Sequence, residues 1–265
     1  MKENKNQHIK TAPQAKRGPQ NSWGGVADWY DEYLETNKDS YQEKVIAPNL
    51  LRILDIKKGM KIADVACGQG FFARKFKTAG AYVIGSDISL ELIASAKKHS
   101  KDIEYVVSPA HKLPFLNDES VDAVVIVLAI QNIKEMDLVF REAQRVLAKE
   151  GRLILVLNHP AFRIPKRSSW EFDDKNKKQY RRIDGYLTES KNTIVMHPGQ
   201  AESEETISYH RSLQDFFKVF YKTNFAVTRL EEWISHKKSE SGPRQLAEDV
   251  ARKEIPMFMM IEAKK

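Results

Sequence analysis

The chain has 265 residues, of which 42% are hydrophobic and 30% are charged, and its formal net charge is +7. No apolar run approaches the roughly 20 residues that a membrane-spanning helix needs, and the N-terminal segment lacks the apolar stretch of a secretory signal. A single cysteine excludes an internal disulfide framework and is typical of a reducing compartment. We therefore expect a cytoplasmic globular protein without a membrane span.

The positive charge gathers in two stretches. Residues 1–22 contain five Lys and Arg against one Glu, and residues 163–191 contain nine Lys and Arg against five acidic residues, so each stretch has a net charge of +4. The first stretch has almost nothing to bury, which predicts a disordered basic tail. Such a tail can bind nucleic acid or only aid solubility, and the sequence leaves both interpretations open.

From residue 23 onward, two helical segments reach residue 54, and short apolar runs then alternate with further helical segments. Near-continuous apolar strands that alternate with helices predict a parallel sheet covered on both faces, which is a doubly wound α/β fold. The predicted strands are residues 61–66, 81–86, 103–107, 121–128 and 152–157; the helices are residues 71–79, 90–98 and 137–148, the last followed by a turn at 149–151.

The regular alternation fails after residue 158. Residues 159–210 are dense in charge and contain three prolines, but aromatic residues such as Trp170 give them something to pack. We therefore interpret residues 159–210 as a substrate lid inserted after the fifth strand. The insertion separates a cofactor-binding core, residues 23–158, from the C-terminal part of the same core, residues 211–265.

The C-terminal part has its own signals of regular structure. The spacing of Ser212 and Asp215 is that of a capping box, which predicts the start of a helix. Residues 225–230 and 256–261 then read as two final strands.

Gly68-Gln69-Gly70 stands between the first predicted strand and the next helix. Glycines at this place let the chain turn tightly and bring its backbone against a ligand at the carboxyl edge of the sheet. The run from Gly68 to Ala73 also fits the G-x-G-x-x-A dinucleotide pattern, so NAD remains an alternative cofactor. Asp87 follows the second predicted strand, where it can accept both ribose hydroxyls of an adenosine. Its alternative role is a helix N-cap.

Five short motifs stand in a fixed order along the chain. They are DVACGQG at residues 64–70, GSDIS at 85–89, LPF at 113–115, SVDAVV at 120–125, and EAQRVL at 142–147 with GRL at 151–153. Together they resemble class I S-adenosylmethionine-dependent methyltransferases, most closely the ubiquinone/menaquinone-type branch. The likeness covers residues 23–158 and resumes at residue 210. It implies a Rossmann-like, mostly parallel seven-stranded sheet with an antiparallel last strand, S-adenosylmethionine as cofactor and S-adenosylhomocysteine as product.

The resemblance also implies roles in cofactor binding. Asp64 would reach toward the methionine amino group, Asp87 would accept the ribose hydroxyls, and Ile88 would lie against the adenine. Pro109 departs from the family, which commonly has Asp before the alanine, so the adenine amino group must find another acceptor. The implied contacts are Asp64, Ala66, Cys67, Gly68, Gly70, Asp87, Ile88, Ala110, His111 and Leu128. Cys67 is interpreted as a small residue at the bend and not as a nucleophile.

A catalytic base and contacts to the methyl acceptor are further predictions. His159 follows the fifth predicted strand, at the edge where this kind of sheet presents ligands, and histidine can remove a proton near neutral pH. His210 is the second candidate base, with a structural role as its alternative. The predicted acceptor contacts are Tyr30, Tyr180, Arg181, Tyr186 and His197, and no metal site is predicted.

The expected reaction is methyl transfer to an oxygen, nitrogen or carbon nucleophile of a small molecule. An RNA or ribosome methyltransferase is the alternative, with the basic tail and the lid gripping phosphates. Against it, residues 129–132 carry no Asn-Pro-Pro-Tyr-type motif. An NAD-dependent enzyme is a weaker alternative, because a long helical segment precedes the glycine loop. A non-catalytic cofactor-binding regulator is a further alternative, which would bind the cofactor without turnover. The acceptor and the oligomeric state stay open.

Overall fold

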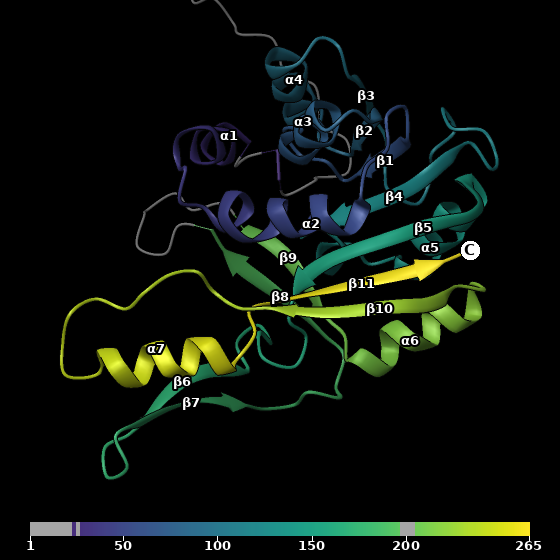
Figure 1. Cartoon of the computed structure of the whole chain (residues 1–265). Helices are drawn as coiled ribbons and strands as arrows, with labels where there is room; N and C mark the ends of the chain where they lie inside the picture. The colour runs from purple at the N-terminus through teal and green to yellow at the C-terminus, as the bar shows by residue number, and fades with distance from the viewer. Residues whose placement is uncertain (1–22, 25–26, 197–204) are drawn as a thin grey trace, which may run out of the picture.

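A seven-stranded sheet forms the centre of the computed structural model, which describes residues 23–24, 27–196 and 205–265 (Figure 1). Six strands run parallel, and β11 runs antiparallel between β5 and β10. The order is β3 (Glu104–Val107), β2 (Tyr82–Asp87), β1 (Lys61–Val65), β4 (Val121–Val127), β5 (Leu147–Asn158), β11 (Phe258–Lys264) and β10 (Ala226–Trp233). The predicted Rossmann-like fold with an antiparallel last strand is confirmed.

Both faces of the sheet are buried, which explains why its central strands are apolar along their whole length. In β4, Ala123 and Val125 belong to one core cluster, and Val124 and Ile126 belong to the other. Helices α2 (Ala47–Leu54), α3 (Phe71–Thr78) and α4 (Leu90–His99) pack into the first cluster. Helices α5 (Met136–Val146) and α6 (Leu213–Lys222) cover the other face.

The predicted strands and helices of the core appear within a few residues of their expected limits. The turn expected at residues 149–151 differs, because β5 begins at Leu147 and passes through Glu150 in a left-handed conformation, with a φ of 62°. The pairing with β4 shifts register between Val121 and Ala123, so the turn is an irregularity inside the strand. The capping box is present, since Ser212 and Asp215 bond each other's backbone at the start of α6.

The insertion after β5 contains two antiparallel strand pairs, which the sequence did not predict. The first pair is β6 (Ser168–Asp173) with β7 (Lys178–Ile183), and the second is β8 (Ser190–Val195) with β9 (Glu205–His210). None of the residues of β6 and β7 is fully buried, so no apolar alternation marks them in the sequence.

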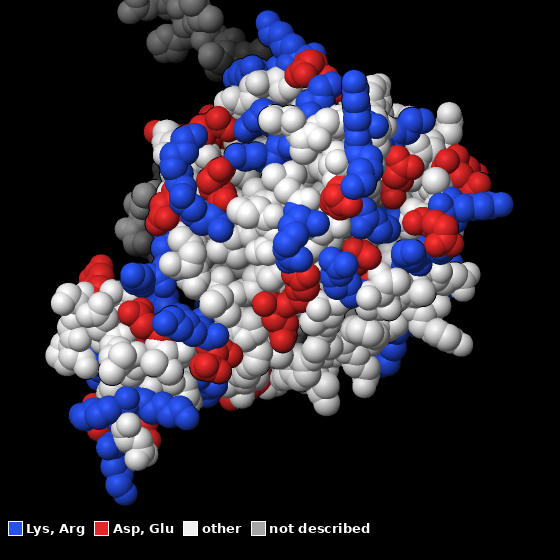
Figure 2. Space-filling view, in the orientation of Figure 1, with Lys and Arg blue, Asp and Glu red and all other residues white. Residues whose placement is uncertain are grey.

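A further unpredicted helix, α7 (Gln245–Glu254), packs beside β7. Figure 1 shows β6, β7 and α7 together at one end of the molecule, away from the seven-stranded sheet. These three elements are called the insertion lobe below. Figure 2 shows Lys and Arg side chains gathered on this part of the surface, at the lower left.

The turn from β1 into α3 depends on a close approach of two elements. Gly70 has a φ of 79° and is the N-cap of α3. A Cβ at this position would collide with the Tyr105 hydroxyl of β3, which lies beneath the loop. The glycine is therefore required both by its backbone conformation and by the space that Tyr105 fills.

We predict that Gly70→Ala lowers the free energy of unfolding by about 2–3 kcal/mol, because it adds a steric collision to the cost of a left-handed alanine. Denaturant unfolding would measure the loss. The matched control is Gly59→Ala: Gly59 has a φ of 84°, but nothing lies within 4 Å of a Cβ built on it. The control should lose only about 1 kcal/mol, and equal losses would contradict the steric account.

Candidate functional site

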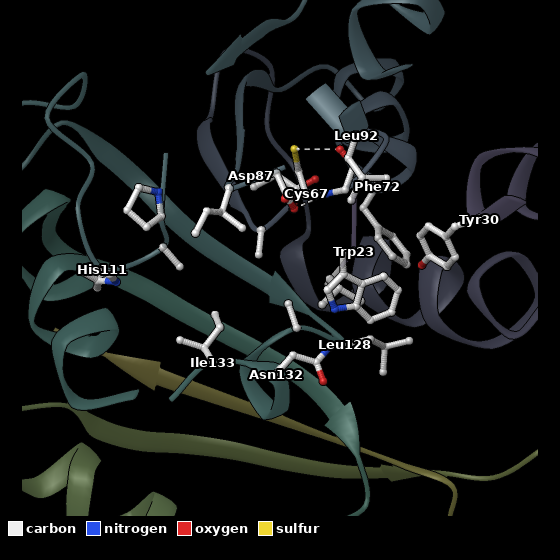
Figure 3. A pocket seen from close by; sticks show the side chains of 18 of the residues that line it. Trp23, Tyr30, Cys67, Phe72, Asp87, Leu92, His111, Leu128, Asn132 and Ile133 are labelled. Atoms are coloured by element: carbon white, nitrogen blue, oxygen red, sulfur yellow. Dashed lines mark hydrogen bonds between the residues drawn. The ribbon is translucent and has the colours of Figure 1, made fainter. Parts of the chain in front are cut away.

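A cavity of about 550 Å³ opens at the carboxyl ends of β1, β2 and β4 (Figure 3). This size is within the range of small-molecule and cofactor sites. The predicted residues that line it are Tyr30, Asp64, Ala66, Cys67, Gly68, Asp87, Ile88, Ala110, His111 and Leu128. The structure thus brings ten of the predicted contacts to one cavity, at the edge of the sheet where the glycine loop turns. Gly70 shapes the loop but does not line the cavity.

Asp87 links the ends of β1 and β2. Its two carboxylate oxygens accept hydrogen bonds from the backbone N–H groups of Gly68, at 2.9 Å, and Ser89, at 2.8 Å. The N-cap of α4 is Ser89, whose hydroxyl accepts from Leu92 N. Asp87 is therefore not the helix cap, and its remaining lone pairs can accept further hydroxyl groups in the cavity. Burial raises the pKa of this carboxyl group.

Asp64 is the most deeply buried acidic group of the cavity wall, with 1% of its surface exposed. Its Oδ2 atom has no hydrogen-bond partner among residues 23–24, 27–196 and 205–265. Burial raises the pKa of Asp64 to about 7, and the neighbouring charge of Asp87 adds to this rise. A buried carboxylate without a partner is costly, so a cationic group from a ligand would be strongly favoured beside it.

Two non-glycine residues of the wall have left-handed backbones. Ala66 has a φ of 57° and Leu128 a φ of 53°, directly after β1 and β4. Such conformations cost energy for residues with a Cβ. Strained backbones of this kind concentrate at ligand sites, and here they occur at the two neighbouring strand ends that border the cavity.

Helix α1 (Ala27–Thr36) forms one wall through Tyr30 and Leu34. Burial raises the pKa of Tyr30 to about 12, so its hydroxyl stays protonated at neutral pH. Glu35 of the same helix pairs with Arg74 and accepts a hydrogen bond from Gln69, the residue between the two loop glycines. Helix α1 is thereby attached to the glycine loop that it faces.

The part of the cavity farther from Asp64 contains residues that the sequence analysis did not assign. Asn132 and Ile133 lie on the loop after β4. Their position just after a strand end could have identified them. Ile207 and Tyr209 belong to β9, whose short alternation of polar and apolar residues was a strand signal that the sequence analysis missed. The unassigned residues include Trp23, Asn132, Ile133, Ile207 and Tyr209, and Figure 3 shows Asn132 near Trp23 and Ile133.

The two candidate bases lie outside this cavity. His159 is 2% exposed, its Nε2 lies 2.6 Å from Glu232 Oε1, and its Nδ1 accepts from the backbone N–H of Ala161. Burial lowers its pKa, although Glu232 opposes this effect. His210 is also buried and donates from Nε2 to the carbonyl oxygen of Tyr186 at 2.7 Å. Both histidines thus have hydrogen-bond partners within the described residues, and their roles as catalytic bases stay predictions.

Three of the remaining predicted acceptor contacts, Tyr180, Arg181 and Tyr186, do not line the cavity either. Tyr180 is exposed on β7, and Arg181 donates to the carbonyl of Phe162 while it stacks on Trp170 at 5.2 Å. The hydroxyl of Tyr186 accepts from Leu213 N at the start of α6. His197 and the basic tail lie outside the residues that the structure describes. The roles assigned to these residues stay predictions.

One group with metal-ligand spacing occurs in the described part of the chain, formed by Asp31, Glu35 and His99. Its members already have partners: Asp31 and His99 contact each other at 2.7 Å, and Glu35 pairs with Arg74.

In the part of the chain that the structure describes, no helix combines the length and the apolar character that crossing a membrane requires.

The cavity fits S-adenosylmethionine on the chemistry of its wall. The unpartnered Oδ2 atom of Asp64 suits the amino group of the methionine part, and Asp87 retains acceptor sites for ribose hydroxyls. A family model described as "Methyltransferase domain" matches residues 63–155, which include both aspartates. The resemblance to class I S-adenosylmethionine-dependent methyltransferases is thereby confirmed, and S-adenosylmethionine is the cofactor it assigns.

Relatives and solved structures agree with this match. The demethylmenaquinone methyltransferase of Thermotoga maritima is 37% identical over 136 residues, 49% of this chain and 57% of that protein. That of Streptomyces avermitilis is 31% identical over 52% of this chain and 59% of its own length. The chain thus spans less than two thirds of these relatives. A crystal structure of an S-adenosylmethionine-dependent methyltransferase from Mesorhizobium loti has a TM-score of 0.68 and 26% identity, covering 88% of this chain and all of that one.

We predict that Asp64→Asn stabilises the ligand-free protein at pH 8 by about 1–3 kcal/mol. The folded state holds a proton on Asp64 up to a pH of about 7, whereas the unfolded chain releases it near pH ~4. The free energy of unfolding therefore falls as the pH rises from the unfolded pKa to the folded pKa of Asp64. The asparagine side chain does not ionise, so the variant avoids this loss. Denaturant unfolding between pH 4 and pH 8 measures it.

The control for this variant is Asp174→Asn, because Asp174 is 75% exposed at the side chain. The control should leave the pH profile of stability unchanged. If Asp64→Asn keeps the wild-type pH profile, the raised pKa of Asp64 is wrong.

The placement of His159 leads to a prediction that separates structure from catalysis. His159→Ala should lower the free energy of unfolding by about 2–4 kcal/mol, through the lost hydrogen bond and the space left behind. Transfer of labelled methyl groups per folded molecule should stay within a few-fold of wild type. Glu232→Gln, which weakens the same contact from its exposed side, serves as the comparison. A roughly 100-fold loss of transfer in folded His159→Ala would instead support the catalytic role predicted for this histidine.

Proposed function

We propose that this protein transfers the methyl group of S-adenosylmethionine to a nucleophilic oxygen, nitrogen or carbon of a small molecule. One observation carries the proposal: a single cavity joins Asp64, whose Oδ2 atom has no partner in the described chain, and the ribose-type acceptor Asp87 to a wall of aromatic and aliphatic side chains. The two aspartates suit the cofactor, and the aromatic and aliphatic wall offers an apolar surface to the methyl acceptor.

The cofactor contacts follow from the positions of these groups. Asp64 would pair with the amino group of the methionine part, and Asp87 would accept the ribose hydroxyls. The backbone of Ala66 and Gly68 would lie against the cofactor, because both have left-handed conformations on the cavity wall. Ile88, Ala110 and His111 would border the adenine, and Cys67 would fill the bend. Burial raises the pKa of Cys67, which agrees with a packing role.

The sulfonium of the bound cofactor supplies an electrophilic methyl group, so the protein's task is alignment and the exclusion of water. Trp23, Tyr30 and Leu128 surround the cavity with apolar surface that serves this purpose. The positive charge of the cofactor's amino group would be balanced by Asp64, whose pKa is raised chiefly by burial.

The acceptor that suits the rest of the wall is a hydroxylated aromatic molecule. Tyr209 and Ile207 of β9 and Ile133 of the loop after β4 offer flat and apolar contact surface. Asn132 provides a polar group in the same region, which could bind a ring oxygen. Relatives named demethylmenaquinone methyltransferase support an aromatic acceptor of this class.

Residues 159–210 would act as a substrate lid, as the sequence suggests. The support is that β9 brings Ile207 and Tyr209 to the cavity from within this insertion. Arg211, directly after β9, donates to the carbonyls of Ile133 and Lys134 at 2.8 and 2.7 Å. The lid would therefore be attached to the loop that lines the acceptor side.

We predict that labelled methyl groups from S-adenosylmethionine enter the small-molecule fraction of an extract of the source cells when the full chain is added. Asp87→Ala should reduce binding of S-adenosylhomocysteine by about 100-fold, because it removes charge-assisted hydrogen bonds to the ribose and releases Gly68. Calorimetry measures the binding, and scintillation counting of the two fractions measures the transfer.

The comparison variant is Asp122→Asn, whose side chain accepts from Lys61 N at the start of β1, at the opposite end of that strand. It should bind S-adenosylhomocysteine as wild type does. Binding of NADH in its place would refute the proposed cofactor. Label found only in RNA would favour the nucleic-acid alternative, and binding without any label transfer would favour a non-catalytic regulator.

A further inference from the structure

A second, smaller cavity of about 40 Å³ lies beside the first. Its walls come from the end of β5, the loop after β4, the segment that follows β5, and β9 with the residue after it. Among the described residues, Tyr209 is the one that lines both cavities. Most of the other wall residues are polar, among them Gln131, Asn158, Arg163, Ser208, His210 and Arg211.

The charge of this wall is positive and lacks a counter-charge. Among the described residues that line the cavity, two are arginines and none is acidic. The guanidinium of Arg211 is satisfied by the carbonyl oxygens of Ile130, Ile133 and Lys134. Arg163 differs, because no carboxylate of the described chain lies within 4 Å of it.

Arg163 is also short of hydrogen bonds. Its Nε atom is buried and has no partner in the described part of the chain. Its guanidinium stacks over Trp170 at 6.0 Å, and Arg181 stacks over the same ring at 5.2 Å. Burial lowers the pKa of Arg163; the nearby Tyr41 hydroxyl opposes this effect, and the charge of Arg252 adds to it. A half-buried arginine that faces other arginines and no acid is unfavourable unless an anion joins it.

The size of the cavity limits what such an anion can be. A water molecule needs about 10–15 Å³ of space measured in this way, so the cavity holds about three non-hydrogen atoms. A carboxylate group has three such atoms, and its planar pair of oxygens matches the fork of a guanidinium. Larger groups such as phosphate exceed this space.

We propose that Arg163 and the polar wall around it form a binding subsite for a carboxylate-sized anion, next to the methyl-transfer cavity and sharing Tyr209 with it. Two sources can supply the carboxylate. It can be a free small anion, or it can be a substituent of the acceptor that passes Tyr209, and this second form rests on the proposed function.

The first experiment measures anion binding on the full chain, without any turnover. Thermal unfolding and calorimetry follow sodium acetate at constant ionic strength, with sodium sulfate as the balancing salt because the sulfate ion has no carboxylate group and is as large as phosphate. Acetate should bind saturably to wild type. Arg163→Gln should weaken this binding by about tenfold or more, as expected for the loss of a charged hydrogen-bond partner.

The matched control is Arg182→Gln, because Arg182 is an exposed arginine of the neighbouring strand pair that already has Asp184 as its partner. It should bind acetate as wild type does. Arg163→Lys provides a second variant if the glutamine variant folds poorly, and circular dichroism and S-adenosylhomocysteine affinity check the fold of each. The proposal is overturned if wild type shows no saturable acetate binding, or if Arg163→Gln and Arg163→Lys both bind acetate like the control.

A second arm identifies the source of the carboxylate. Binding of 3,4-dihydroxybenzoate and of catechol is compared in the presence of S-adenosylhomocysteine. If the acceptor carries the carboxylate, the first compound should bind wild type about tenfold more tightly, and Arg163→Gln should lose this preference. Equal binding of the two compounds together with saturable acetate binding assigns the subsite to a free anion. S-adenosylhomocysteine affinity reports on the proposed function separately, so failure of one proposal leaves the other standing.

Discussion

The hydrogen bond from the backbone N–H of Gly68 to the carboxylate of Asp87 is the contact on which the cofactor side of the cavity depends. It joins the loop after β1 to the end of β2, and the second oxygen of Asp87 holds the backbone of Ser89 at the start of α4. Charge-assisted bonds of this kind are among the stronger polar contacts in proteins. One buried side chain thus fixes the relative positions of three elements.

The acceptor side is held by contacts between distant parts of the chain. Arg211 follows β9, yet its guanidinium binds the carbonyls of Ile130, Ile133 and Lys134 after β4. Its pKa is lowered by burial, so this arrangement carries a desolvation cost that the three carbonyls offset. The consequence is a firm connection between the insertion and the loop that lines the cavity.

The difference between local and distant contacts explains what the sequence could predict. Asp64, Gly68 and Asp87 stand in or beside apolar strands with a regular period, so their common edge follows from the topology of a parallel sheet. Tyr209 lies in a strand pair that does alternate, but its place on the cavity wall depends on how the insertion folds back, which no local pattern gives. His159 stands at a strand end as expected, but its ring turns toward Glu232 of β10, which no local pattern reveals.

The insertion lobe has consequences for how the molecule opens. Every residue of β6 is only half-buried, Ala251 is the one buried residue of α7, and the aromatic rings of Trp170 and Phe172 are covered by guanidinium groups. Without an apolar core, the lobe gains little of the stability that the sheet supplies. We therefore expect the lobe to be a separate cooperative unit at the low end of the local stability scale, with backbone amides that exchange with solvent while the sheet stays folded.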